Sequence, residues 1–132
     1  MIGVILVSHG SLAEGLKSAA EMIVGQQEGL LAIGMQPRAD VQSLRRELEA
    51  AIAQVRKQGE VLVLVDILGG TPANASFHLA STGTQVICGI NLPMLLEILT
   101  QREYATLQEL TALALQAARE GVIHLTQQLA DQ

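Results

Sequence analysis

Two side chains that can take part in group transfer follow short apolar runs in this sequence. His9 comes shortly after the apolar residues Ile2–Val7, and Asp66 comes directly after Val61–Val65. A carboxylate that hydrogen-bonds to one imidazole nitrogen fixes the tautomer of the ring and leaves the other nitrogen free as a nucleophile. His9 and Asp66 are therefore predicted to form a catalytic pair, in which His9 is the nucleophile and Asp66 orients it.

The residues that follow Asp66 are of the kinds that surround a bound anion. The glycines Gly69 and Gly70 let backbone amides approach a ligand closely, and Thr71 supplies a hydroxyl group. A helix that begins at Thr71-Pro72 adds the positive end of its dipole. A nucleophilic histidine facing these groups indicates phosphoryl transfer through a phosphohistidine, with Gly70 and Thr71 binding the phosphoryl oxygens. The sequence has no Gly-x4-Gly-Lys loop and no visible cluster of Mg²⁺ ligands, so direct use of a nucleotide is not expected.

The same residues also have ordinary structural explanations. A histidine after a strand is usually a turn residue, and Asp66 at the end of a strand can cap a turn. A helix starts well at Thr71-Pro72 whatever its function. Cys88 lies in an apolar run and is expected in the core. Three histidines and one cysteine without ligand spacing predict no metal site, and no cofactor is expected.

Alternating apolar runs and amphipathic segments predict the elements that position these residues. Buried strands are expected at Ile2–Val7, Leu30–Met35, Val61–Val65 and Gln85–Ile90, with a short final strand at Val122–Thr126. Helices are expected from near Ser11 to Gly25, from Val41 to about Gln58, from Thr71, from Asn91, and from Thr106 to about Glu120. The capping-box pairs Ser11/Glu14 and Thr106/Glu109 mark two helix starts. Asp40 and Asn91 are expected to cap two others.

This alternation of strands and helices predicts an α/β fold. Wholly apolar strands indicate a mainly parallel sheet covered on both faces, of the flavodoxin-like, doubly wound type with strand order 2-1-3-4. Ligands bind such a sheet beyond the carboxyl ends of its strands, where the winding reverses between the first and the third strand. Because His9 and Asp66 follow these two strands, the topology alone predicts that they meet.

Length, composition and charge narrow the functional classes. The 132 residues suit one domain, spanning residues 1–132, and 49% of them are hydrophobic. The net charge of −5 argues against nucleic-acid binding. No apolar run has the length of a membrane helix, and no secretory signal precedes the first strand. The single cysteine, Cys88, fits a reducing cytosol, so a cytoplasmic location is expected.

Three stretches of the sequence are similar to the motifs of one known family. They are Val7-Ser-His9-Gly10, Asp66-Ile-Leu-Gly-Gly-Thr-Pro-Ala-Asn74 and Gly89-Ile-Asn-Leu-Pro-Met94. In this order and spacing they resemble the enzyme IIA domain of the mannose family in the bacterial phosphoenolpyruvate-dependent sugar phosphotransferase system. The resemblance implies that His9 accepts a phosphoryl group from the histidine-containing phosphocarrier protein and passes it to a IIB subunit. It also implies that Asp66 orients the histidine, and that Thr71 and nearby amides hold the phosphoryl oxygens.

The resemblance has further implications for assembly. It implies a homodimer in which the C-terminal strand, Val122–Thr126, pairs with the sheet of the partner subunit. The sequence ends at Gln132, so the chain is expected to meet IIB as a separate molecule and the membrane subunits IIC and IID only indirectly. Peripheral association with the membrane transporter is compatible with this expectation.

Two other functions stay open at this point. The phosphocarrier subunit of dihydroxyacetone kinase resembles the same fold with a histidine in the same place, although the turn Gly69–Pro72 is more similar to the sugar-transport branch. A non-catalytic regulatory domain is the second alternative, in which the same groups bind a small anion and His9 is only a ligand contact.

Overall fold

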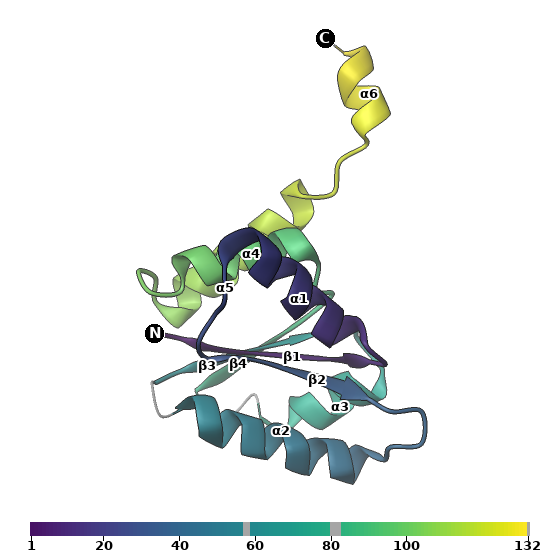
Figure 1. Ribbon diagram of the computed structural model, residues 1–132, viewed down its shortest axis with the longest axis vertical. Helices are drawn as coiled ribbons and strands as arrows, with labels where there is room; N and C mark the ends of the chain where they lie inside the picture. Colours follow the sequence, from purple (N-terminus) through teal and green to yellow (C-terminus); the bar gives the residue numbers. More distant parts are fainter. Residues whose placement is uncertain (57–58, 80–82, 132) are drawn as a thin grey trace.

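A four-stranded parallel sheet forms the centre of the molecule. The computed structural model describes residues 1–56, 59–79 and 83–131. The strands are β1 (Gly3–His9), β2 (Leu30–Met35), β3 (Val61–Val65) and β4 (Thr84–Cys88), in the spatial order β2-β1-β3-β4 (Figure 1). The predicted fold class and strand order are confirmed. Strands β1 and β3 pair in parallel from Gly3 with Val61 to Val7 with Val65, so the residues that follow them leave the same edge of the sheet.

Helices cover both faces of this sheet. The helices α1 (Leu12–Val24), α4 (Leu92–Gln101) and α5 (Leu107–Glu120) lie on one face, and α2 (Val41–Val55) and α3 (Thr71–Phe77) lie on the other (Figure 1). Side chains of β1 alternate between the two layers: Val4 and Leu6 belong to one core cluster, Ile5 and Val7 to the other. Both faces of the strand are buried, which explains why its sequence is apolar throughout rather than alternating.

The helix starts follow most of the predicted capping signals. The carboxylate of Asp40 accepts a hydrogen bond from the backbone N–H of Ser43 at 2.7 Å, and the side chain of Asn91 accepts one from Met94 at 3.0 Å. Thr106 and Glu109 form the complete capping box at the start of α5. The predicted end of α2 near Gln58 lies outside the described residues, and α2 itself ends at Val55.

Helix α1 begins where predicted, but its predicted capping box does not form. Ser11 occupies the N-cap position without a side-chain hydrogen bond to the helix. The hydroxyl of Ser8, five residues before Ala13, accepts the N–H of Ala13 instead, at 2.8 Å. The backbone at Ser11 is not extended, as a capping residue usually is, so its side chain is not aimed at the free amides.

The end of β4 and the C-terminal segment also differ from the prediction. Strand β4 ends at Cys88 rather than at Ile90, because Gly89 turns the chain with a φ of +94°. The strand predicted at Val122–Thr126 does not form in the single chain. Residues 122–124 have no regular secondary structure, and α6 (Leu125–Ala130) begins directly after them. This segment leads away from the sheet (Figure 1), so it has no neighbouring strand with which to pair.

A buried arginine lies at the end of the sheet where the strands begin, opposite to the end that carries His9. The side chain of Arg102 is only 2% exposed and donates hydrogen bonds to the backbone carbonyls of Ile2, Glu28 and Gly29. Burial lowers the pKa of its guanidinium group. Arg102 therefore ties the end of α4 to the amino ends of β1 and β2, at a distance from the candidate catalytic residues.

Candidate active site

The structure brings His9 and Asp66 into direct contact at the carboxyl edge of the sheet. His9 is the last residue of β1, and Asp66 directly follows β3, where its N–H donates to the carbonyl of Val7 at 3.2 Å. The Nδ1 atom of His9 lies 2.7 Å from Oδ2 of Asp66. The backbone N–H of His9 donates to the same oxygen at 3.0 Å. The meeting predicted from topology is therefore found in the structure.

The carboxylate of Asp66 is held in its ionised form. Burial by itself raises the pKa of Asp66, but the backbone N–H and the imidazole of His9, together with the N–H of Ile67, outweigh burial and hold the pKa below its ordinary value of 3.8. The Ile67 N–H donates to Oδ1 at 2.9 Å. An ionised carboxylate can only accept hydrogen bonds, so the proton of a neutral His9 ring lies on Nδ1. Nε2 then carries the free electron pair.

The two side chains differ in their access to solvent. The side chain of Asp66 is 11% exposed, whereas that of His9 is 48% exposed. The carboxylate is thus fixed inside the protein, and the ring that it orients is open to an approaching molecule. This asymmetry suits a histidine that must react with a group carried by another molecule.

The edge of the ring that carries Nε2 faces the start of α3. A Cβ atom placed on Gly70 would lie 2.8 Å from Cε1 and 3.3 Å from Nε2 of His9. Gly70 is the N-cap of α3 and Thr71 is the first residue of the helix. The first amides of any helix lack partners within the helix. A side chain on Gly70 would occupy the space beside Nε2, which explains why glycine suits this position.

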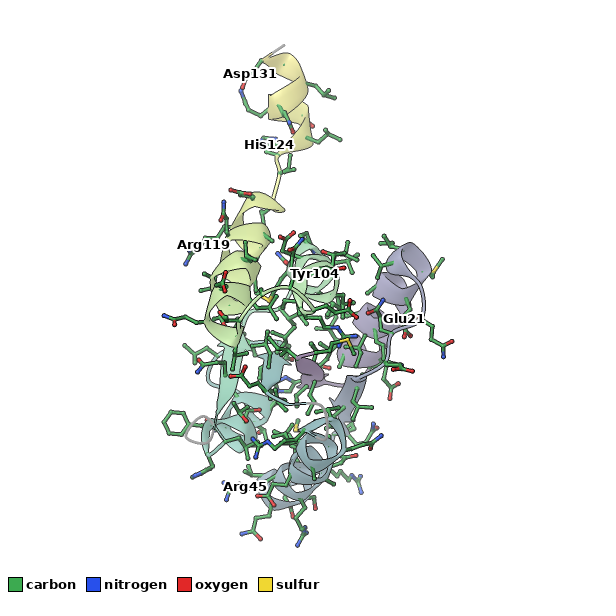
Figure 2. The ribbon with its side chains drawn as sticks, turned by 90° about the vertical axis from the view of Figure 1, so that its left-hand side faces the viewer. Glu21, Arg45, Tyr104, Arg119, His124 and Asp131 are labelled. Carbon is green, nitrogen blue, oxygen red and sulfur yellow. The ribbon has the colours of Figure 1, made fainter. Side chains whose placement is uncertain are left out.

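Cys88 and the two other histidines lie outside this pair. Cys88 is partly buried at the end of β4, where burial and the negative charge of Asp66 raise the pKa of its thiol. His78 is exposed at the C-terminal end of α3, and its ring meets that of Phe77 edge to face. Figure 2 places His124 in the C-terminal arm, residues 122–131, away from the body of the protein.

The described part of the chain shows neither a group of metal ligands nor a membrane-spanning helix. Across residues 1–56, 59–79 and 83–131, no group of three or more His, Cys, Asp or Glu side chains lies close enough together to hold a metal ion. Within the same ranges, every helix is too short or too polar to cross a membrane.

Three exposed apolar side chains lie close in sequence to His9 and Asp66. Leu12 lies three residues after His9 and is 49% exposed, and Ile67 and Leu68 follow Asp66 with exposed fractions of 57% and 80%. Apolar side chains that gather at the surface are typical of protein interaction sites. These residues were not predicted from the sequence, because nothing local distinguishes an exposed apolar residue from a buried one.

Known proteins are similar in sequence to most of this chain. The family model described as "PTS system fructose IIA component" matches residues 3–115. The fructose-specific EIIA component of Bacillus subtilis (strain 168) is 38% identical over 112 residues, which are 83% of this chain and 77% of that protein. The mannose-specific EIIAB component of Escherichia coli (strain K12) is 37% identical over 124 residues, which cover 92% of this chain but 38% of that longer protein.

Solved structures share the fold. The crystal structure of the phosphotransferase system component EIIA from Streptococcus agalactiae superimposes with a TM-score of 0.89 at 31% identity, covering 96% of this chain and 99% of that one. The mannose/sorbose specific IIA subunit from Enterococcus faecalis superimposes with a TM-score of 0.75 at 27% identity, covering 92% of each chain. These matches agree with the family resemblance of the three sequence motifs. The chain therefore belongs to the mannose family of IIA components, the phosphotransferases that act as phosphocarriers in sugar transport by the phosphotransferase system.

Proposed function

We propose that Nε2 of His9 accepts and returns the phosphoryl group. The observation that carries this proposal is the 2.7 Å contact between Nδ1 of His9 and Oδ2 of Asp66. That contact occupies Nδ1 and leaves Nε2 as the nitrogen with a free electron pair, on a ring that is 48% exposed. A protonated or carboxylate-bound nitrogen cannot attack phosphorus, so the geometry favours Nε2 over Nδ1.

The transfer step follows from this arrangement. The electron pair on Nε2 forms the new N–P bond while the N–P bond to the donor's histidine breaks, and the donor's imidazole leaves with the bonding electrons. The proton on Nδ1 of His9 stays in place, so the phosphorylated ring is a cation that the ionised Asp66 stabilises. Passage to the acceptor histidine repeats the step in reverse. The exchange of one phosphohistidine for another needs no further reactant.

Gly70 and Thr71 are proposed to bind the phosphoryl oxygens. Gly70 lies beside Nε2, where a group bonded to this nitrogen would emerge. Charge in phosphoryl transfer is spread over three equatorial oxygens, so positioned hydrogen-bond donors contribute most of the catalysis. The hydroxyl of Thr71 and the amides at the start of α3 are donors of this kind.

The partners proposed for this site are other proteins. The histidine-containing phosphocarrier protein is the proposed donor and a IIB subunit the proposed acceptor, in the cytoplasm, with IIC and IID reached only through IIB. A half-exposed histidine, with the exposed Leu12, Ile67 and Leu68 close in sequence to His9 or Asp66, suits docking of a protein surface. A closed cavity would suit a small-molecule substrate better.

A homodimer is the proposed assembly. Val122, Ile123, Leu125 and Leu129 are all exposed on the C-terminal arm. Strand β4 is an edge of the sheet, and a hollow of about 520 Å³ lies beside it, lined by Gln85, Leu107 and Leu115 among others. The exposed apolar arm of one subunit needs a surface to cover it, and the open edge of β4 in the other subunit needs a neighbouring strand. Exchange of the arm between two subunits meets both needs.

The proposal is tested by following one phosphoryl group from the phosphocarrier protein to this protein and on to a IIB subunit. The protein is incubated with phosphoenolpyruvate, enzyme I and the phosphocarrier protein, and its intact mass is measured. One phosphoryl group that is labile in acid and stable in base is expected, and it should leave on addition of a cognate IIB subunit. A protein that gains no mass, or one that gains it on another residue, contradicts the assignment of His9.

A further inference from the structure

The backbone turn that follows His9 is held from inside by the side chain of Ser8. Ser8 is only 1% exposed, so water competes little for the hydrogen bonds of its hydroxyl. Its hydroxyl donates to the carbonyl of His9 at 3.0 Å and accepts the N–H of Ala13 at 2.8 Å. One hydroxyl thus links the peptide unit after His9 to the first turn of α1. The hydrogen bond from Ala13 is buried, so its loss would leave a polar group without a partner.

Strand β2 supports the same turn from the other side. Gly34 lies opposite Ser8 in the register between β1 and β2. A Cβ atom on Gly34 would overlap the carbonyl oxygen of Gly10. Gly10 has a φ of +53°, and its N–H donates to the carbonyl of Met35 at 2.9 Å. The turn at Gly10 therefore packs against β2 at a point where only a glycine at position 34 leaves room for the carbonyl oxygen of Gly10.

The position of this turn determines the contact with Asp66. The backbone N–H and the ring of His9 both bond to the same oxygen of Asp66, at 3.0 and 2.7 Å. A shift of the backbone at His9 therefore disturbs both hydrogen bonds together. Residues that fix this backbone act on the tautomer of the ring without touching the ring.

We propose that Ser8 and Gly34 are positioning residues for the phosphoryl-transfer site, which hold the turn after His9 so that Nδ1 stays on Asp66 and Nε2 stays free. This inference rests on the proposed function of His9 and goes beyond it, because neither residue contacts the phosphoryl group. Misplacement of a reacting group by about 1 Å can slow a reaction by roughly 100-fold. The positioning residues are thus expected to matter for the rate although they take no part in the chemistry.

The test compares Ser8→Ala with a matched change elsewhere in the sheet. Thr84 is also 1% exposed and its hydroxyl accepts a hydrogen bond from the guanidinium of Arg56 at 2.9 Å, at the far end of β4 from His9. Thr84→Val therefore removes one buried hydroxyl without touching the turn. For both full-length variants, the ¹⁵N chemical shifts of the His9 ring give the share of the Nδ1–H tautomer, and single-turnover transfer from the phosphocarrier protein gives the rate.

Ser8→Ala is expected to lose a large part of the Nδ1–H tautomer and to accept phosphate roughly 10- to 100-fold more slowly. Thr84→Val is expected to keep the tautomer and the rate of the unchanged protein. Gly34→Ala should reproduce the effect of Ser8→Ala, and it carries the test if Ser8→Ala does not fold. An unchanged tautomer or an unchanged rate in the folded variant overturns the proposal. If the unchanged protein accepts no phosphate, the proposed function fails, and the ring shifts alone still decide whether Ser8 positions His9.

Discussion

The Nδ1 atom of His9 lies 2.7 Å from Oδ2 of Asp66, and the same carboxylate oxygen accepts the backbone N–H of His9 at 3.0 Å. Two bonds from one residue to one oxygen fix both the place of the backbone and the direction of the ring. The carboxylate is also anchored by the N–H of Ile67. This arrangement defines which nitrogen is available for chemistry.

Replacement of His9 should abolish phosphorylation. In His9→Ala the nucleophilic nitrogen is absent, so no gain in mass is expected after incubation with the phosphoenolpyruvate-dependent donors. His78 is a suitable control, because it is exposed and lies at the opposite end of α3 from Gly70. His78→Ala should still take up one phosphoryl group. Labelling of His9→Ala at the normal level would exclude His9 as the acceptor.

Replacement of Asp66 should slow transfer while the fold persists. Asp66→Ala removes the group that holds the proton on Nδ1, so the ring divides between its two tautomers and the phosphorylated cation loses its counter-charge. An aspartate that holds a catalytic histidine in the correct tautomer can contribute roughly 10⁴-fold to a rate, and a decrease between roughly 100-fold and this size is expected in rapid-quench measurements. The circular dichroism spectrum serves as the control for folding. Wild-type kinetics in this variant would remove Asp66 from the mechanism.

Replacement of Thr71 should have a milder effect. The hydroxyl donates one hydrogen bond to a charged phosphoryl oxygen, worth about 1.5–3 kcal/mol, so Thr71→Ala should slow transfer by roughly 10- to 150-fold. Thr71→Ser keeps the hydroxyl and is the matched control, for which a near-normal rate is expected. A loss much larger than roughly 150-fold in Thr71→Ala, or an equal loss in Thr71→Ser, would show that the residue acts in another way.

The titration of Asp66 should report its contacts with His9. Its pKa lies below the ordinary value of 3.8, so the ionised carboxylate stabilises the fold above about pH 4, and this stabilisation is lost as the pH falls through the lower folded-state pKa. The ¹³C chemical shift of the carboxyl carbon gives the midpoint directly. In His9→Ala the midpoint should move upward, because the imidazole is gone, although the backbone N–H groups of residue 9 and Ile67 stay. A midpoint unaffected by this change would mean that the ring does not interact with the carboxylate in solution.

Charged residues on the C-terminal arm should disrupt the proposed dimer. In the unchanged protein, light scattering is expected to give the mass of two chains. The double substitution Val122→Asp and Ile123→Asp places two carboxylates where the proposal requires buried apolar contacts, so the mass should fall toward that of one chain. Met22→Asp is the control, because Met22 is an exposed apolar residue on α1 and not part of the C-terminal arm. A monomeric unchanged protein, or a dimer unaffected by the double substitution, would contradict the exchange.

Most of the architecture could be predicted because it is encoded locally. A capping box depends on residues three apart, and Thr106 with Glu109 forms one as expected. A strand covered on both faces must be apolar throughout, which made β1 and β3 recognisable. The parallel topology then brings the residues after these two strands to one edge of the sheet. The meeting of His9 and Asp66 follows from strand order alone, without knowledge of any side-chain contact.

The amino-acid sequence by itself thus determined the order of the elements and the pair of residues that meet at the carboxyl edge of the sheet. Only the tertiary structure decided that Nδ1 contacts Asp66, that Ser8 rather than Ser11 caps α1, and that Gly34 supports the turn after His9. These contacts join segments whose relative register is set by the packed sheet. The absence of a strand at Val122–Thr126 in the single chain has the same origin, since a strand exists only where another strand pairs with it, and no property of the segment alone supplies that neighbour.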